Sequence, residues 1–327
     1  MEDRKKNIER EILYSVYRND IIEELTRESE TPDFTITDKK NRKIGVEITR
    51  IFSSKASSIL WKSEKFKDDF IKNHLTKKKK KIPRHLRKIQ VIKVEGGEEL
   101  IEHGHAIVYE QSLTEFFAFF ETLINKKSSS YEKKQSDLSF VCLIAKDEED
   151  FLRNAKLPIK KLYGFLRQFS IFDSILKSNF QEITLLASFD SGKYHIPLYW
   201  LIFINEFQTF RFFWDEKIKI LDQQKTNLNF FSNLIIVLLN LGFKNIYLAN
   251  DKNDKIIVIG TKYLRINLDN GDFKEESFLA LEISNLLKAE IFYKKYANYQ
   301  SMYSEYLKFR SKYLPLIEED HFNKISD

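Results

Sequence analysis

The chain is poor in cysteine, glycine and proline, because its 327 residues include one Cys, nine Gly and five Pro. The single cysteine, Cys142, excludes an intrachain disulfide and a cysteine-based zinc site. The first six residues, MEDRKK, are charged and lack the apolar stretch of a secretory signal. The most apolar segments, 194–204 and 230–243, are too short and too polar to span a membrane. We therefore expect a cytoplasmic protein without a membrane partner.

Residues 30–51 are the most informative segment and are predicted to form two strands joined by the polar linker 38–43. Side chains alternate between the two faces of a strand. By this parity the apolar faces of the two strands comprise Phe34, Ile36, Ile44, Val46 and Ile48. The opposite faces carry Asp33, Glu47 and Thr49, so we expect these three side chains to emerge together.

Two acidic side chains held on adjacent strands can bind a divalent metal. Carboxylate oxygens are the ligands that Mg²⁺ prefers, and Mg²⁺ keeps several waters and needs few protein ligands. A bound metal activates water, orients a phosphate and stabilises developing charge. Asp33 and Glu47 are therefore predicted to bind Mg²⁺ or Mn²⁺. The alternative interpretation is a solvated polar hairpin face, because Asp and Glu are ordinary surface residues.

The string Pro-Asp-Phe at 32–34, followed by Ile-Gly-Val-Glu-Ile-Thr at 44–49, resembles the PD-(D/E)xK nuclease superfamily, whose fold is restriction-endonuclease-like. It is most similar to the branch that reads E-x-T where others read E-x-K. The resemblance implies that Asp33 is the motif aspartate, Glu47 the motif glutamate and Thr49 the residue in the lysine position. Threonine offers a hydrogen bond but no charge. Either a nearby cation substitutes, or the site is slow, or it is not catalytic.

The first helix of this superfamily often adds an acidic residue to the site. Apolar spacing predicts a helix over residues 5–19, and Glu9 borders its inward face. Glu9 is thus the candidate third acid. Other acids that the sequence leaves open as contributors are Glu11, Glu24, Glu30 and Asp137.

The segment that follows the hairpin is strongly basic. From Lys55 to Lys93 there are fourteen Lys or Arg against three acids, a net charge of +11, whereas the whole chain carries +6. Such charge binds phosphate backbones, although charge runs are often merely solvated. Lys62 or Lys65 is also a candidate for supplying the positive charge that a lysine at position 49 would provide. The predicted nucleic-acid contacts are Lys62, Lys65, Lys77, Lys78, Lys79, Lys80, Lys81, Arg84 and Arg87.

The pattern as a whole predicts an α/β (α+β) protein with a restriction-endonuclease-like mixed sheet flanked by helices. We expect a nuclease domain over residues 1–150 and an α+β domain over 151–327 for target or partner recognition or dimerisation. Further predicted strands are 89–94 (in the core), 137–145, 182–188, 195–204, 209–214, 245–249 and 255–260. Further predicted helices are 112–126, 158–170, 227–241 and a group between 275 and 312.

The leading hypothesis is a Mg²⁺-dependent endonuclease acting on DNA. The resemblance places it in restriction or anti-phage defence, with a second copy or a defence protein as partner. The alternative is a catalytically degenerate nuclease fold that binds nucleic acid or a partner protein, suggested by Thr49. A toxin-like or structural protein without nucleic-acid contact is disfavoured by the uneven distribution of charge.

Overall fold

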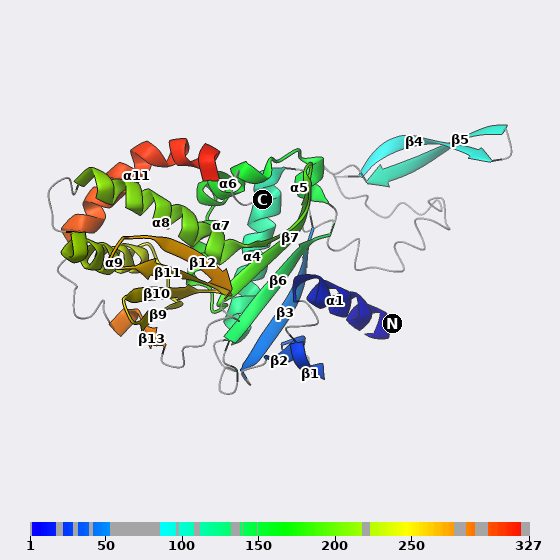
Figure 1. The fold of residues 1–327 in the computed structure, drawn as a ribbon. Helices are drawn as coiled ribbons and strands as arrows, with labels where there is room; N and C mark the ends of the chain where they lie inside the picture. Colours follow the sequence, from blue (N-terminus) through cyan, green and yellow to red (C-terminus); the bar gives the residue numbers. More distant parts are fainter. Residues whose placement is uncertain are drawn as a thin grey trace.

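The structure is a computed structural model of a mixed α/β protein (Figure 1). The residues that it describes are 2–17, 22–28, 32–38, 42–52, 86–95, 98–107, 112–131, 138, 140–148, 150–217, 223–277, 286–291 and 300–321. Among the helices in these ranges, none is both long and apolar enough to cross a membrane.

The first sheet is mixed and has the strand order β1-β2-β3-β6-β7-β8. Strands β1, β2 and β3 form an antiparallel meander, β3, β6 and β7 run parallel, and β8 returns antiparallel to β7. The predicted hairpin is confirmed as the β2–β3 pair, and the segment after the first helix is a strand. The bounds are β1 (Ile22–Glu28), β2 (Phe34–Asp38), β3 (Lys43–Ile51), β6 (Phe140–Asp147), β7 (Glu182–Phe189) and β8 (Gly192–Pro197).

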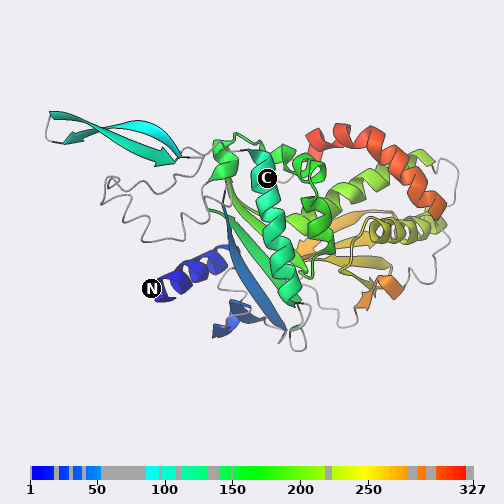
Figure 2. The same ribbon diagram turned by 180° about the vertical axis from the view of Figure 1, so that it is seen from behind.

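Helices cover both faces of this sheet. Helix α1 (Glu2–Val16) lies in front of β3 in Figure 1, and α4 (Leu113–Tyr131) crosses the other face in Figure 2. Ile12 and Leu13 of α1 pack in one apolar cluster with Val46 and Ile48. The period-2 pattern of β3 sends its odd-numbered residues to the α4 side, where Ile51 joins the larger core. The sheet therefore has two buried faces.

The second sheet is antiparallel and has the order β12-β11-β10-β9-β13. Helices α8 (Leu198–Lys217), α9 (Gln223–Asn240) and α11 (Gln300–His321) accompany it. One continuous apolar cluster runs from α4 through β7 and α8 to β10 and β11, so the two sheets share a core. The bounds are β9 (Ile246–Asp251), β10 (Asp254–Ile259), β11 (Lys262–Asn267), β12 (Phe273–Ser277) and β13 (Leu287–Lys288). Short helices connect the two parts: α5 (Phe151–Asn154), η1 (Ile159–Lys161), α6 (Leu162–Gln168) and α7 (Ile171–Lys177).

Four element predictions are wrong in whole or in part. Most of 195–204 and all of 209–214, predicted as strands, lie in α8, which is buried on nearly every side and therefore shows no helical alternation of apolar and polar residues. The predicted core strand 89–94 lies in β4 (Leu86–Glu95), which among the described strands pairs with β5 (Glu98–Ile107) alone, in a separate two-stranded sheet. The predicted helices between 275 and 312 are replaced in part by β12 and β13.

A buried carboxyl group lies where the two sheets meet. Oε1 of Glu182 accepts hydrogen bonds from the backbone amides of Ile183 (2.8 Å) and Tyr199 (2.9 Å). Its other oxygen faces the β10–β11 turn at Gly260, where a Cβ atom would collide with it. Gly260 also has φ of +61°, which favours glycine. Burial raises the pKa of Glu182 to about 8.

A second buried carboxylate anchors the last helix. Glu206 of α8 is 0% exposed and accepts hydrogen bonds from the hydroxyls of Tyr163 (2.7 Å) and Tyr306 (2.6 Å). The guanidinium of Arg310 forms an ion pair with the same carboxylate. Charge and hydrogen bonds thus hold α11 against α6 and α8.

Candidate functional site

Glu47 lies in the middle of β3 and points toward α4. It is 2% exposed, and Thr49, two residues further on the same face, is 8% exposed. The sequence places these side chains on one face, as the structure does. The alternative interpretation, a solvated polar face, is wrong for Glu47 and Thr49. The cause is α4, which covers the polar side of the hairpin as well.

Two side chains of α4 hold the Glu47 carboxylate. The ammonium of Lys127 forms an ion pair with Oε1, and the hydroxyl of Tyr131 donates to Oε2 at 2.5 Å. Residues four apart lie on the same face of a helix, so Lys127 and Tyr131 reach Glu47 side by side. Burial and the neighbouring Glu47 raise the pKa of Tyr131 far above its usual value. Tyr131 therefore remains a proton donor to Glu47.

Asp33 approaches Glu47 from the end of β2. Strand β2 begins at Phe34, which pairs with Val46, so β3 extends beyond the end of its neighbour. There the backbone amide of Ile48 donates to Oδ2 of Asp33 at 2.7 Å. Asp33 is thus fixed to the residue that follows Glu47.

The proline and glycine of the motif help to place Asp33. A Cβ atom on Gly45 would lie 2.7 Å from Cδ1 of Leu138 and 3.0 Å from Cγ of Pro32. The Pro32 ring therefore packs directly on the backbone of β3, two residues before Glu47. A larger residue at position 45 would push Pro32 away and displace the aspartate that follows it.

Neighbouring negative charge changes the titration of Asp33. Burial raises its pKa to about 6, and the charges of Glu47 and Glu9 act in the same direction. The amide of Ile48 and the ammonium of Lys127 lower it. The carboxyl of Asp33, just before β2, is thus influenced by three charged side chains. They are Glu9 of α1, Glu47 of β3 and Lys127 of α4. We call these four residues the Glu47 cluster.

Of the other acids that the sequence left open, the structure describes the side chain of one. Glu11 is on the exposed side of α1. Glu24 belongs to β1, but its side chain lies outside the described residues, as do Glu30 and Asp137.

The donor set suits a divalent metal that needs few protein ligands. Asp33 and Glu47 offer hard oxygen donors, and the pKa of Asp33 is raised first by burial and then by the negative charge of Glu47, which a cation would offset. No group of three or more His, Cys, Asp or Glu side chains positioned to hold a metal occurs within the described part of the chain. The described carboxylates that could hold a metal here are therefore two, Asp33 and Glu47.

The cation beside the site comes from a place that sequence reasoning missed. Lys62 and Lys65, the candidates for replacing the motif lysine, lie outside the described residues. Lys127 supplies an ammonium instead. The helix predicted over 112–126 ends one residue before Lys127, because the serines at 128–130 are typical of a loop. In the structure Ser129 and Ser130 donate to the carbonyls of Lys126 (2.9 Å) and Lys127 (2.6 Å) inside the last turn of α4. Extending the 3.6-residue period past 126 would have placed Lys127 and Tyr131 on one stripe.

Other predicted nucleic-acid contacts fall on undescribed parts of the chain. Arg87 is in β4, with its side chain outside the description. The remaining ones, Lys77, Lys78, Lys79, Lys80, Lys81 and Arg84, are also outside the described residues.

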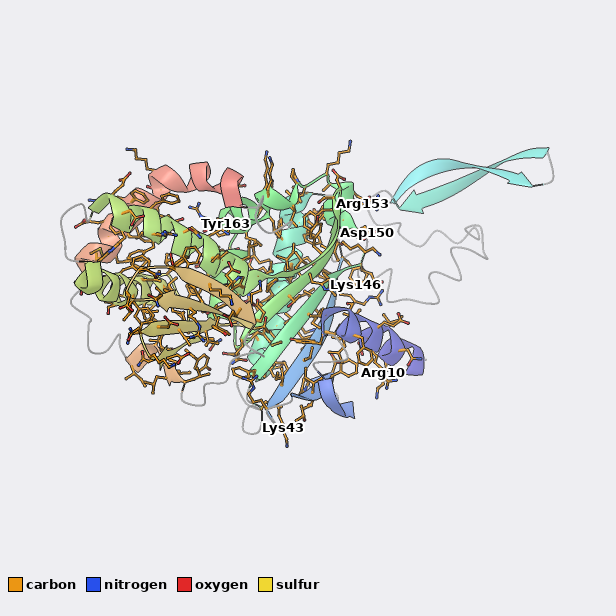
Figure 3. All side chains as sticks on the ribbon, viewed as in Figure 1. Arg10, Lys43, Lys146, Asp150, Arg153 and Tyr163 are labelled. Carbon is orange, nitrogen blue, oxygen red and sulfur yellow. The ribbon has the colours of Figure 1, made fainter. Side chains whose placement is uncertain are left out.

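The described cations nearest the carboxyl ends of β3 and β6 are partly paired. Glu148 bridges Arg50 (2.7 Å) and Lys146 (3.3 Å). Figure 3 shows Lys146 and Arg153 at the same end of the first sheet. Asp150 is labelled at the same end, so cations and carboxylates alternate there.

Comparison of the chain with protein-family models, with curated proteins and with solved structures finds no match.

Proposed function

We propose that the chain is a metal-dependent nuclease that uses the Glu47 cluster to cleave phosphodiester bonds in DNA. The observation that carries the proposal is the meeting of Asp33, just before β2, with Glu47 of β3 and Lys127 of α4. Two carboxylates with one ammonium are the groups that phosphodiester hydrolysis needs beside a metal. The mixed sheet with a helix on each face is consistent with the restriction-endonuclease-like fold implied by the motif.

In this mechanism Asp33 and Glu47 would hold Mg²⁺ or Mn²⁺, and Glu9 would add negative charge at the edge. The metal, when bound, would polarise the phosphate and activate a water. Tyr131 keeps Glu47 oriented through its hydroxyl. Lys127 offers the positive charge that Thr49 cannot, so it would offset charge that develops on the phosphate. The basic segment 55–93 and the cations Arg50 and Lys146 would contact the phosphate backbone.

One observation favours a second candidate, a nuclease fold that binds nucleic acid without cleaving it. Both oxygens of Glu47 already have partners in Lys127 and Tyr131, and the side chain is 2% exposed. A carboxylate held in this way also serves to fix α4 on the sheet. In both cases a role in restriction or anti-phage defence, with a second copy or a defence protein as partner, belongs to the proposal.

Cleavage assays separate the two candidates. Plasmid and single-stranded DNA are incubated with the protein in Mg²⁺, in Mn²⁺ and in EDTA, with the variants Asp33→Asn and Glu47→Gln beside the wild type. Asp190→Asn is the matched control, because Asp190 is exposed in the β7–β8 turn. Metal-dependent cleavage that both site variants lose and the control keeps is the expected result. Retention of DNA by the wild type without cleavage under any condition would support the binding candidate instead.

A further inference from the structure

A polar cavity lies at the junction of the two sheets, away from the Glu47 carboxylate. Its volume is about 290 Å³, and it is lined by the start of β6, the loop 178–181 before β7 and the start of β9. A neighbouring hollow of about 390 Å³ shares Lys244 and Glu290 with it. Small-molecule sites commonly begin at about 300 Å³, so the first cavity is large enough for one small ligand.

The charged side chains of this cavity favour an anion. Lys244 and Lys288 face one acid, Glu290. The ammonium of Lys244 donates to the backbone carbonyl of Lys177 at 3.1 Å. Within the described ranges, neither Lys244 nor Lys288 forms an ion pair with a carboxylate, whereas Lys177 in the neighbouring hollow pairs with Asp173 at 3.0 Å. The two lysines are therefore available to a ligand such as a phosphate group.

Two uncharged side chains that line the cavity are held in place by hydrogen bonds to the backbone. The amide of Asn245 donates to the carbonyl of Phe180 at 3.1 Å, which leaves its own oxygen as a fixed acceptor. The side-chain oxygen of Gln181 accepts from the amide of Val141 at 2.5 Å. Such fixed amides can distinguish the hydrogen-bonding edge of a base without being reordered by it.

Tyr247 adds an aromatic ring beside these amides. Its ring packs edge-on against Phe140, with 6.4 Å between the ring centroids. An aromatic ring binds a base by stacking, and a carboxylate such as Glu290 can accept hydrogen bonds from ribose hydroxyls. We infer that this cavity binds a nucleoside monophosphate, with its phosphate at Lys244 and Lys288, and that the bound nucleotide regulates the Glu47 cluster.

The proposed regulation of the Glu47 cluster rests on the proposed function. It follows from the loop 178–181, which lines the cavity and also contacts α4. The backbone amide of Asn179 donates to Oγ of Ser128 at 2.8 Å, and its side-chain amide donates to the Ser128 carbonyl at 3.1 Å. Ser128 directly follows Lys127 in α4. A shift of the loop 178–181 on ligand binding is therefore transmitted to the ammonium that pairs with Glu47.

The same loop supports the second partner of Glu47. The ring of Phe180, between Asn179 and Gln181, packs against Tyr131 with 5.5 Å between centroids. Tyr131 donates its hydroxyl to Glu47. Both α4 residues that hold the carboxylate thus contact, directly or through Ser128, the loop that lines the cavity.

Binding is tested by isothermal titration calorimetry of the full chain with AMP, GMP, CMP and UMP, without metal or DNA. Separate titrations use adenosine, inorganic phosphate and a ten-residue oligothymidylate. We expect saturable binding of at least one nucleotide, weakened about tenfold or more in Lys244→Gln. Lys193→Gln, at an exposed position in β8, is the matched control and should bind as the wild type does.

Three results would overturn the assignment. They are no saturable nucleotide binding below about 1 mM, equal binding by Lys244→Gln, and binding of inorganic phosphate or the oligonucleotide as tight as that of any nucleotide. Because this titration involves no cleavage, a protein that cleaves nothing still gives a clear answer.

The coupling is tested by the reciprocal effect of the two ligands. Mg²⁺ affinity is measured by calorimetry with and without saturating nucleotide. We expect a change of about fivefold or more in the wild type and in Ser129→Ala, and a smaller change in Ser128→Ala, which loses the hydroxyl bonded to Asn179. A wild-type Mg²⁺ affinity that the nucleotide leaves unchanged overturns the coupling. Absence of Mg²⁺ binding in any state refutes both the coupling and the metal site, but leaves the binding assignment standing.

Discussion

Replacing Asp33 with asparagine should stabilise the fold while it removes one ligand of the proposed metal site. Asparagine has nearly the same shape, and its side-chain oxygen can still accept the amide hydrogen of Ile48. It differs in carrying no charge at any pH. The variant therefore isolates the cost of ionising Asp33 beside Glu47 and Glu9.

The size of this cost follows from the pKa. Its rise from 3.8 to about 6 means that the folded chain binds a proton more tightly than the unfolded chain does. The free energy of unfolding of the wild type should therefore fall as pH rises from about 4 to about 6 and change no further above that. One pKa unit corresponds to about 1.4 kcal/mol, so the full shift is about 3 kcal/mol, which contact with solvent reduces to about 1–2 kcal/mol.

Urea denaturation between about pH 4 and pH 8 measures the effect. We expect Asp33→Asn to equal the wild type near pH 4 and to exceed it by about 1–2 kcal/mol near pH 8. Mg²⁺ at about ten times its dissociation constant should add about 1.4 kcal/mol to the wild type and little to the variant. Asp190→Asn should behave as the wild type throughout. The reasoning fails if Asp33→Asn is the less stable protein at pH 8, or if both proteins lose stability equally between pH 4 and pH 6.

Three further changes test other groups. Lys127→Gln should lower the DNA cleavage rate about 100-fold, and a rate within about threefold of wild type would show that Lys127 is not the missing cation. Glu182→Gln should raise the free energy of unfolding at pH 7 by up to about 3 kcal/mol, because a folded-state pKa of about 8 makes the native protein lose stability from about pH 4.5 to pH 8. Thermal unfolding that shows the same pH dependence in both proteins would contradict this. Arg310→Met should cost about 3–5 kcal/mol in urea, because it leaves Glu206 buried without its charged partner; a loss under about 1 kcal/mol would show that the ion pair does not hold α11.

The parts of the candidate site that lie close together in the chain could be predicted from the sequence. Parity placed Asp33 and Glu47 on one face of the predicted hairpin, and the register of the β2–β3 pair then brings them close together. Parity states which side chains share a face, but not what covers that face. The covering helix α4 begins more than sixty residues after Glu47, so the burial of Glu47 depends on long-range packing that no local pattern encodes.

The wrong element predictions have the same origin. Helix α8 is in contact with β7 and with β10 of the second sheet, so its apolar side chains surround the helix axis. Periodicity then gives no signal, and the aromatic residues from Tyr199 to Trp214 favour strands by propensity alone. The segment is nevertheless a helix, because packing against both sheets outweighs its local strand propensity.

The position of Lys127 changes the meaning of Thr49. For the proposed nuclease, a positive charge beside the carboxylates matters more than its position in the chain. Lys127 would supply that charge from the helix that covers β3, because its ammonium is paired with Glu47. Thr49 can then remain small, as its position under α4 requires, since it is 8% exposed. Under the proposed function the threonine on β3 and the lysine on α4 would act together, and the threonine by itself is no argument against that proposal.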